Sequence, residues 1–168
     1  IAWEKGTDRS KFSRGVVDKY TWKSLGSSYL PGELNAAFLL AQLEACTEIT
    51  ERRIQTWNRY HNAFTELAKV GLITLPKVYS DRSHNGHIFY LILDETIDRS
   101  MVLRTLAERG IGANSHYQPL HSSDAGEKYA THMGDLKNTD LISRQIIRLP
   151  LWNKISKQEI EFVVEGIH

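Results

Sequence analysis

The segment best suited to chemistry is a short polar string, SHYQPLH, at residues 115–121. It holds two imidazoles, a phenol, an amide and a stiffening proline: His116, Tyr117, Gln118, Pro119 and His121. Such side chains offer donors, acceptors and stacking surface suited to a sugar or a base. An ordinary turn at a strand end explains the string equally well. Because adjacent strand-end positions face opposite sides, we expect the side chains of His116 and Tyr117 to diverge.

The seven histidines raise the question of a metal site. His84 and His87 are three residues apart near the start of a predicted strand, which places their side chains on opposite faces and disfavours joint ligation. The sequence has no H-E-x-x-H motif and no Cys/His pattern with ligand spacing. We therefore expect surface or hydrogen-bonded histidines rather than metal ligands.

The single cysteine, Cys46, excludes an internal disulfide and any multi-cysteine zinc site. It falls on an apolar helical stripe, so we expect it to be a small core residue. Ser27 and Ser28 follow Gly26, an arrangement typical of an anion-binding turn before a helix, although Gly-Ser turns are common there. The sequence contains no glycine-rich phosphate motif of the Walker or dinucleotide-binding kind.

Two stretches of helical periodicity follow one another in the N-terminal half of the chain. Apolar residues at three- or four-residue steps predict helical structure over residues 33–70, as one long bent helix or as two helices joined near residues 47–50. Gly71 is placed to end this region. Its first part is apolar on more than one face, so we expect more than one face to be covered. The residues concerned are Leu34, Ala37, Phe38, Leu40, Ala41 and Leu43.

The second half alternates predicted strands and helices. The string LITL predicts a short strand before Pro76, and HIFYLILD, residues 87–94, predicts a strand that is buried on both faces. Asp98 can cap a helix that Gly110 closes. Residues 111–117 are expected to form a short strand.

Further along, residues 122–140 are expected to be mostly loop, with one helical turn at most. Residues 141–152 should change from helix to strand before Pro150. Ser156 and Glu159 then form a capping box at the start of the last helix. These elements make the chain a mixed α/β protein.

Composition narrows the classes of function. The 168 residues are 24% charged and 41% hydrophobic, which suits a packed core, and the formal net charge is only +1. A nucleic-acid module would usually concentrate positive charge, so that class is disfavoured. The longest apolar run, AAFLLA, is too short to span a bilayer, and the first residues lack a secretory core segment. We expect a cytoplasmic location.

Several strings, taken together and in order, resemble the DegT/DnrJ/EryC1/StrS family of sugar aminotransferases. They cover essentially the whole chain: EKGTDRSKF at residues 4–12, DKYTWKSLGSSYL at 18–30, L-x-A-A-x-x-x-x-Q-L at 34–43, HYQPLH at 116–121 and RLPL at 148–151. The resemblance implies pyridoxal 5'-phosphate as cofactor and fold type I. It further implies a long helix leading to a small α/β domain with a short, largely antiparallel sheet. Residues 1–70 would be the interface loop and long helix, and residues 71–168 the small domain.

The resemblance also implies an incomplete active site. In the family, the KG-x-x-R segment follows the lysine that forms the Schiff base, so the chain is similar to the C-terminal part of such an enzyme. No lysine here has the family's S-F-x-x-x-K context, and Lys5, Lys11, Lys19 and Lys23 are expected in loops or at the surface. We therefore expect no catalytic residue in this chain and no activity from it alone.

The residues that remain would complete a site shared across a homodimer. The family's loop before the Ala-Ala helix reaches the cofactor phosphate of the neighbouring subunit with a pattern similar to G-x-N-x-R. Here Ser28 stands for the asparagine and Leu30 for the arginine, so the resemblance implies cofactor contacts from Ser28 and Tyr29 only. The turn and one strand edge would contact the nucleotide sugar through His116, Tyr117, Gln118, Pro119, His121 and His87.

The full-length reaction implied is transfer of an amino group from glutamate to dTDP-4-keto-6-deoxy-glucose, giving dTDP-4-amino-4,6-dideoxygalactose. A different class of protein stays open, namely a self-sufficient carbohydrate- or nucleotide-binding module without catalysis. That alternative predicts a chain that folds alone as a monomer with a closed core.

Overall fold

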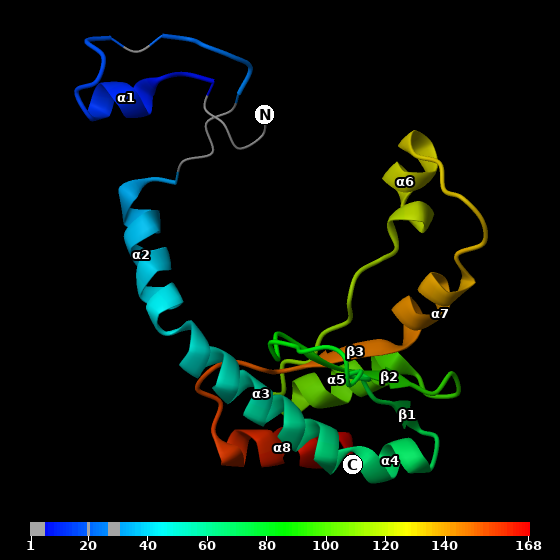
Figure 1. Ribbon diagram of the computed structural model, residues 1–168. Coiled ribbons are helices and arrows are strands. Elements are labelled where there is room, and N and C mark those ends of the chain that lie inside the picture. The colour runs from blue at the N-terminus through cyan, green and yellow to red at the C-terminus, as the bar shows by residue number, and fades with distance from the viewer. Residues whose placement is uncertain (1–5, 20, 27–30) are drawn as a thin grey trace. The chain divides into compact units, whose positions relative to one another are not determined.

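The computed structural model describes residues 6–19, 21–26 and 31–168 (Figure 1). The chain divides into two compact units, Ile1–Ala45 and Cys46–His168. The domain boundary predicted between residues 70 and 71 differs from this division and stays a prediction about the larger fold.

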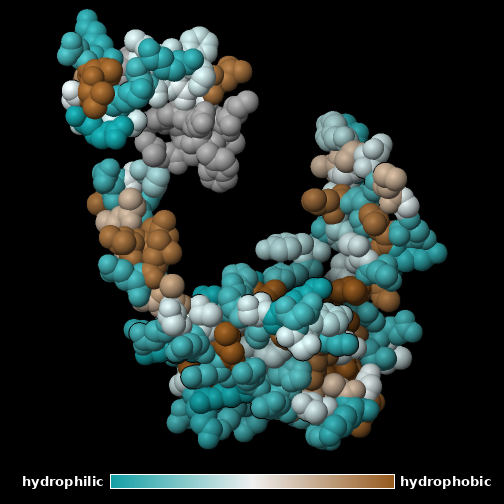
Figure 2. All heavy atoms as spheres, viewed as in Figure 1, coloured by the Kyte–Doolittle hydropathy of each residue, from teal (hydrophilic) through white to brown (hydrophobic). Residues whose placement is uncertain are grey.

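The first unit contains two helices, α1 (Arg9–Ser13) and α2 (Glu33–Glu44). The short helix α1 was expected to be loop, and an antiparallel bridge between Thr7 and Trp22 closes the segment around it. None of the residues of α2 is buried. Figure 2 shows hydrophobic side chains gathered over this helix.

The helical region is interrupted at Ala45, where α2 ends and α3 (Cys46–Ala63) begins. Of the two predicted alternatives, the structure thus has two helices, with the junction slightly earlier than residues 47–50. Cys46 is exposed, so the prediction of a core cysteine is wrong. The apolar stripe that leads to Cys46 lies on α2, and the described residues of the unit Ile1–Ala45 bury none of it. A short helix, α4 (Thr65–Lys69), follows and ends near Gly71, which has a positive φ of 82°.

The second unit is built on a three-stranded antiparallel sheet in the order β1-β2-β3, which confirms the predicted short antiparallel sheet. The strands are β1 (Ile73–Thr74), β2 (Phe89–Leu93) and β3 (Ile146–Leu149). Side chains of β2 alternate between buried and half-buried, so it is not buried on both faces as predicted. Helix α5 contacts β3 and helix α7 contacts β2, and the buried residues of the sheet belong to one core with residues of α3, α5 and α8.

The strand predicted at residues 111–117 is reduced to a single bridge between Asn114 and Arg148. Two backbone hydrogen bonds form this bridge: the Asn114 nitrogen donates to the Arg148 oxygen at 3.0 Å, and the Arg148 nitrogen donates to the Asn114 oxygen at 2.7 Å. The chain then turns away at the proline, so the ladder does not extend. This bridge places the 112–119 segment beside β3.

Five further helices complete the unit: α5 (Arg99–Glu108), the 3₁₀ turn η1 (Leu120–Ser122), α6 (Asp124–Tyr129), α7 (Lys137–Gln145) and α8 (Lys157–Ile167). The carboxylate of Asp98 accepts hydrogen bonds from the backbone nitrogens of Ser100 and Met101, which confirms it as the cap of α5. Ser156 and Glu159 form the predicted capping box of α8. The structure contradicts the prediction of mostly loop at residues 122–140, since α6 and the start of α7 lie there.

The core of this unit is an aromatic cluster between α3 and the sheet. The ring of Phe89 on β2 lies 5.4 Å from Trp57, 5.3 Å from Tyr60 and 6.2 Å from Phe64. Burying one such side chain contributes roughly 1.5–3 kcal/mol. Leu106 of α5 belongs to the same core, as do residues of β3 and α8. The helices α3, α5 and α8 therefore hold the sheet in place (Figure 1).

Among the described residues, the structure contains no helix that is both long and apolar enough to cross a membrane.

Candidate functional site

The polar turn predicted to contact substrate lines two neighbouring cavities beside α7. Both are lined by His116, Tyr117, Gln118 and Pro119. The first has a volume of about 530 Å³ and is completed by polar and apolar residues of η1, α7 and the start of β3. The second, of about 440 Å³, also includes Arg99, Asp140 and Arg144. The structure thus gathers these four predicted residues around hollows large enough for part of a small ligand.

The rings of His116 and Tyr117 do not diverge, so that prediction is wrong. They stack with centroids 4.8 Å apart and an angle of 6° between their planes. The segment carries no regular strand beyond the bridge at Asn114, so the alternation that a strand would impose is lost. Pro119, with φ of −58°, then leads into η1. The phenol of Tyr117 stays largely exposed and free to meet a ligand.

The environment of His116 favours the neutral imidazole. Burial lowers its pKa from the ordinary value of 6.5, and electrostatic interactions with Arg148 and His87 lower it further. Its Nε2 atom is buried, and it has no hydrogen-bond partner in the part of the chain that the structure describes. A neutral imidazole can donate from one ring nitrogen and accept at the other, which suits a polar ligand.

His121, the last residue of the turn motif, has a different setting. Its Nε2 atom lies 3.0 Å from a carboxylate oxygen of Asp140, and its ring meets His132 edge-on at 5.4 Å. It lines a separate hollow near α6 and neither of the two cavities formed by the turn. The contact with Asp140 fastens η1 to α7. The substrate contact predicted for His121 stays untested.

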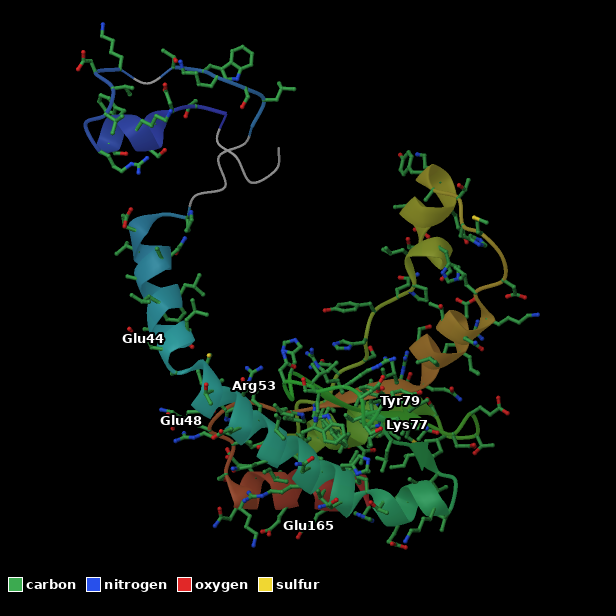
Figure 3. All side chains as sticks on the ribbon, viewed as in Figure 1. Glu44, Glu48, Arg53, Lys77, Tyr79 and Glu165 are labelled. Carbon is green, nitrogen blue, oxygen red and sulfur yellow. The ribbon has the colours of Figure 1, made fainter. Side chains whose placement is uncertain are left out.

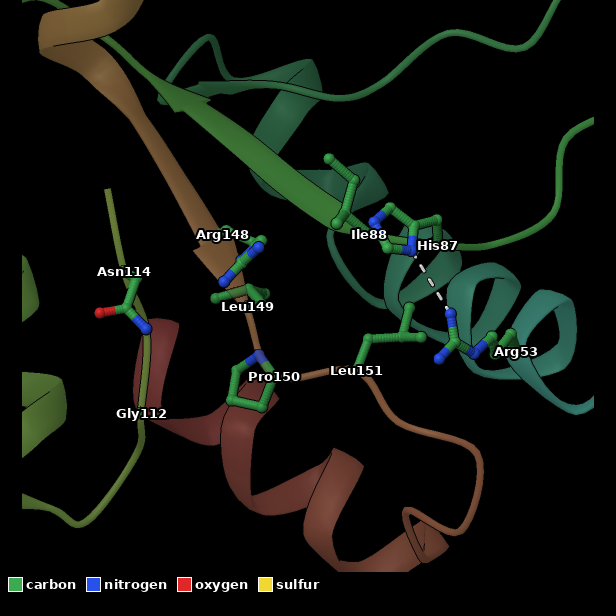
Figure 4. A pocket seen from close by; sticks show the side chains of 9 residues that line it. All are labelled: Arg53, His87, Ile88, Gly112, Asn114, Arg148, Leu149, Pro150 and Leu151. Carbon is green, nitrogen blue, oxygen red and sulfur yellow. Dashed lines mark hydrogen bonds between the residues drawn. The ribbon is translucent and has the colours of Figure 1, made fainter. Parts of the chain in front are cut away.

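His87 lies at another hollow, between α3 and the edge of the sheet (Figure 4). The Nη1 atom of Arg53 donates to its Nδ1 atom at 3.4 Å. Arg148 and Asn114 line the same pocket, so two arginines and an imidazole converge there. Figure 4 shows Arg148 between Asn114 on one side and the pair of Arg53 and His87 on the other.

Arg53, Asn114 and Arg148 are site residues that the sequence pattern did not predict. Arg148 belongs to the RLPL string of the family resemblance. A signal existed for Arg148, because it alternates with the apolar residues Ile147 and Leu149 on a strand. For Arg53 the sequence offered none, since its role depends on a neighbour 34 residues away.

Two other predicted site residues, Ser28 and Tyr29, were expected to contact the cofactor phosphate and lie outside the described residues. His84 packs its ring against Trp57 at 4.6 Å, away from the Arg53 contact of His87. The described residues contain no group of three or more His, Cys, Asp or Glu side chains that could hold a metal ion.

A family model described as the DegT/DnrJ/EryC1/StrS aminotransferase family matches residues 6–168. The chain belongs to this family. It is 30% identical over 140 residues to the spore coat polysaccharide biosynthesis protein SpsC of Bacillus subtilis, a match that covers 80% of the chain and 35% of that protein. The chain thus spans about a third of the length of this relative.

Solved structures of aminotransferases share the fold. The sugar aminotransferase CalS13 of Micromonospora echinospora superposes with a TM-score of 0.76 at 19% identity, over 96% of the chain and 41% of CalS13. A Streptococcus pneumoniae protein solved in its PLP form gives 0.75 at 22% identity, over 89% of the chain and 38% of that protein. Aminotransferases of this family depend on pyridoxal phosphate. The predicted fold class and family are therefore confirmed.

Proposed function

We propose that the full-length protein is a pyridoxal-phosphate-dependent aminotransferase acting on a nucleotide sugar. The family match over residues 6–168 is the observation that carries this proposal. Glutamate would supply the amino group and dTDP-4-keto-6-deoxy-glucose would accept it, giving dTDP-4-amino-4,6-dideoxygalactose for enterobacterial common antigen or related lipopolysaccharide sugars. The non-catalytic binding module is not favoured, because the family match extends over nearly the whole chain.

The cofactor, when bound, would act as the electron sink of the reaction. Ser28 and Tyr29, the residues predicted to contact the cofactor, lie outside the described residues. A homodimer, a cytoplasmic location and the inactivity of these 168 residues alone are further parts of the proposal.

Within that reaction, the described residues would bind and orient the sugar nucleotide. The exposed phenol of Tyr117 can donate and accept one hydrogen bond each, and the buried Nε2 atom of His116 has no partner among the described residues. The stacked rings present a flat surface of the kind that packs against sugars and bases. Pro119 limits backbone motion at the turn, which reduces the entropy lost on binding.

The test follows each half-reaction of the full-length enzyme separately through the absorbance of its cofactor. We expect Tyr117→Phe and His116→Ala to weaken use of the keto sugar nucleotide by up to about tenfold, since each loses one neutral hydrogen bond. The half-reaction with glutamate should be unchanged. Tyr129→Phe is the matched control, because Tyr129 is exposed on α6 and lines neither cavity of the turn.

A variant that loses the glutamate half-reaction while keeping normal affinity for the sugar nucleotide would place the turn at the cofactor end. Absence of transamination with every sugar nucleotide tried would contradict the proposed function itself.

A further inference from the structure

A pocket of about 230 Å³ between α3 and the sheet edge concentrates positive charge. We call it the cationic pocket and define it by Arg53, His87, Asn114 and Arg148. These side chains come from α3, from the segment before β2, from the bridge segment and from β3. No Asp or Glu is among the residues that line it.

The charges of the cationic pocket are not neutralised by the described part of the protein. Neither Arg53 nor Arg148 forms an ion pair with any described carboxylate. The Nε atom of Arg53 is buried and lacks a hydrogen-bond partner within residues 6–19, 21–26 and 31–168. Burying charged donors without partners is costly, so proteins usually satisfy them with an opposite charge. An anion is the kind of partner that would satisfy these donors.

The two acidic residues of α3 lie on other sides of the helix than Arg53. Glu48 pairs with Arg52 and lies five residues before Arg53 (Figure 3), and Glu51 lies two residues before it, about 200° around the helix. The positive field extends to His116, whose pKa is lowered by burial and then by Arg148 and His87. Two guanidinium groups and two imidazoles therefore share this corner of the unit.

The pocket is held in shape by backbone contacts rather than by its own charged groups. Gly86 packs directly on the backbone of α3 at Arg53, which brings His87 beside the guanidinium. On the other side, the hydroxyl of the buried Tyr60 donates to the carbonyl of Pro150 at 2.9 Å. The Asn114 bridge fixes β3 at Arg148. A site with fixed walls and unpaired donors is preorganised for a ligand.

We propose that the cationic pocket binds an oxyanion group of a substrate, either a carboxylate of the amino donor or a phosphate of the sugar nucleotide. The proposal rests on the proposed function for the identity of those substrates. Guanidinium groups match the planar, two-oxygen geometry of carboxylates and phosphates. Arg53 lies 3.4 Å from the Nδ1 atom of His87, which leaves the Nε2 atom of the same ring available to donate to the anion.

The test measures ligand binding by calorimetry on the full-length protein, without turnover. One arm uses the dicarboxylates glutarate and 2-oxoglutarate, and the other uses inorganic pyrophosphate and dTDP. Arg53→Gln and Arg148→Gln should raise the dissociation constant for one arm by about 10- to 100-fold, because each removes a charge-assisted hydrogen bond. Arg104→Gln on α5 is the control, with the same charge change outside the pocket.

If the arginine substitutions weaken binding of the dicarboxylates only, the pocket binds the carboxylate of the amino donor. If they weaken binding of pyrophosphate and dTDP only, it binds a phosphate of the sugar nucleotide. Effects no larger than that of Arg104→Gln, or no binding of either ligand class by the unmodified protein, overturn the proposal. Binding that depends on both arginines in a protein without transaminase activity would reject the proposed function and leave the oxyanion site standing.

A second measurement avoids variants that fail to fold. Phenylglyoxal modifies accessible arginines of the unmodified protein, and mass spectrometry locates the modified residues. A saturating oxyanion of the binding class should protect Arg53 and Arg148 and leave Arg104 reactive. If the oxyanion does not reduce the modification of Arg53 and Arg148, the proposed binding site is contradicted.

Discussion

At the scale of single residues, the pKa of His116 depends on its burial and on its charged neighbours. Burial is the main cause of its lowered pKa, followed by the charges of Arg148 and His87. Because the folded state disfavours the protonated imidazole while the unfolded chain titrates near the ordinary value, His116 contributes stability above that value. That contribution is lost as the pH falls through the folded pKa.

We therefore expect Arg148→Gln to raise the pKa of His116, since it removes one positive charge. Titration of the imidazole protons by NMR measures this directly. The free energy of unfolding should also fall less steeply on acidification in this variant than in the unmodified protein. Arg104→Gln should leave the pKa of His116 where it is, and a similar rise in both variants would show that the effect is not local.

At the scale of elements, the segment before β2 depends on one close contact with α3. Gly86 has a positive φ of 59°, and a Cβ atom there would lie 2.8 Å from the carbonyl carbon of Arg53. The backbone oxygen of Arg53 and the nitrogen of Ile54 would each be 2.9 Å away. These atoms belong to a helix that cannot shift locally without losing core contacts at Trp57.

Gly86→Ala should therefore lower the free energy of unfolding by more than the roughly 1–2 kcal/mol expected from a left-handed alanine alone. Gly134→Ala is a matched control, because Gly134 has φ of 72° and open space around its missing Cβ. Urea denaturation of both variants separates backbone strain from the clash. Equal losses in the two variants would show that the close packing at Gly86 is dispensable.

At the scale of the whole molecule, helix α2 leaves apolar surface uncovered. Its exposed large residues are Leu34, Phe38, Leu39, Leu40 and Leu43. They extend around more of the helix than a single packing face needs, and the described residues of its own unit bury none of them. A contiguous apolar patch of this kind usually marks an interface.

We expect the 168-residue chain to form dimers or larger assemblies by light scattering, with α2 in the contact. The double variant Leu34→Ser with Phe38→Ser should shift the population toward a smaller species. Met133→Ser is the control, since Met133 is 96% exposed and lies outside α2. A clean monomer with cooperative unfolding would contradict this expectation and favour the independent binding module.

The sequence by itself determined the features that depend on near neighbours. Asp98 and Ser156 cap their helices as predicted, because a cap needs only the next two or three backbone nitrogens. The change from α7 to β3 before Pro150 also followed from local pattern, whereas the antiparallel sheet was expected from the family resemblance. Family membership followed from ordered strings spread along the chain.

Only the tertiary structure decided which distant residues share a site. Arg53 and His87 meet across 34 residues because Gly86 allows a loop to pack on a helix backbone, and Arg148 joins them through strand pairing. The stacking of His116 on Tyr117 and the exposure of Cys46 were likewise decided there. Local periodicity describes how a side chain faces within its own element, whereas these positions depend on how separate elements pack against one another.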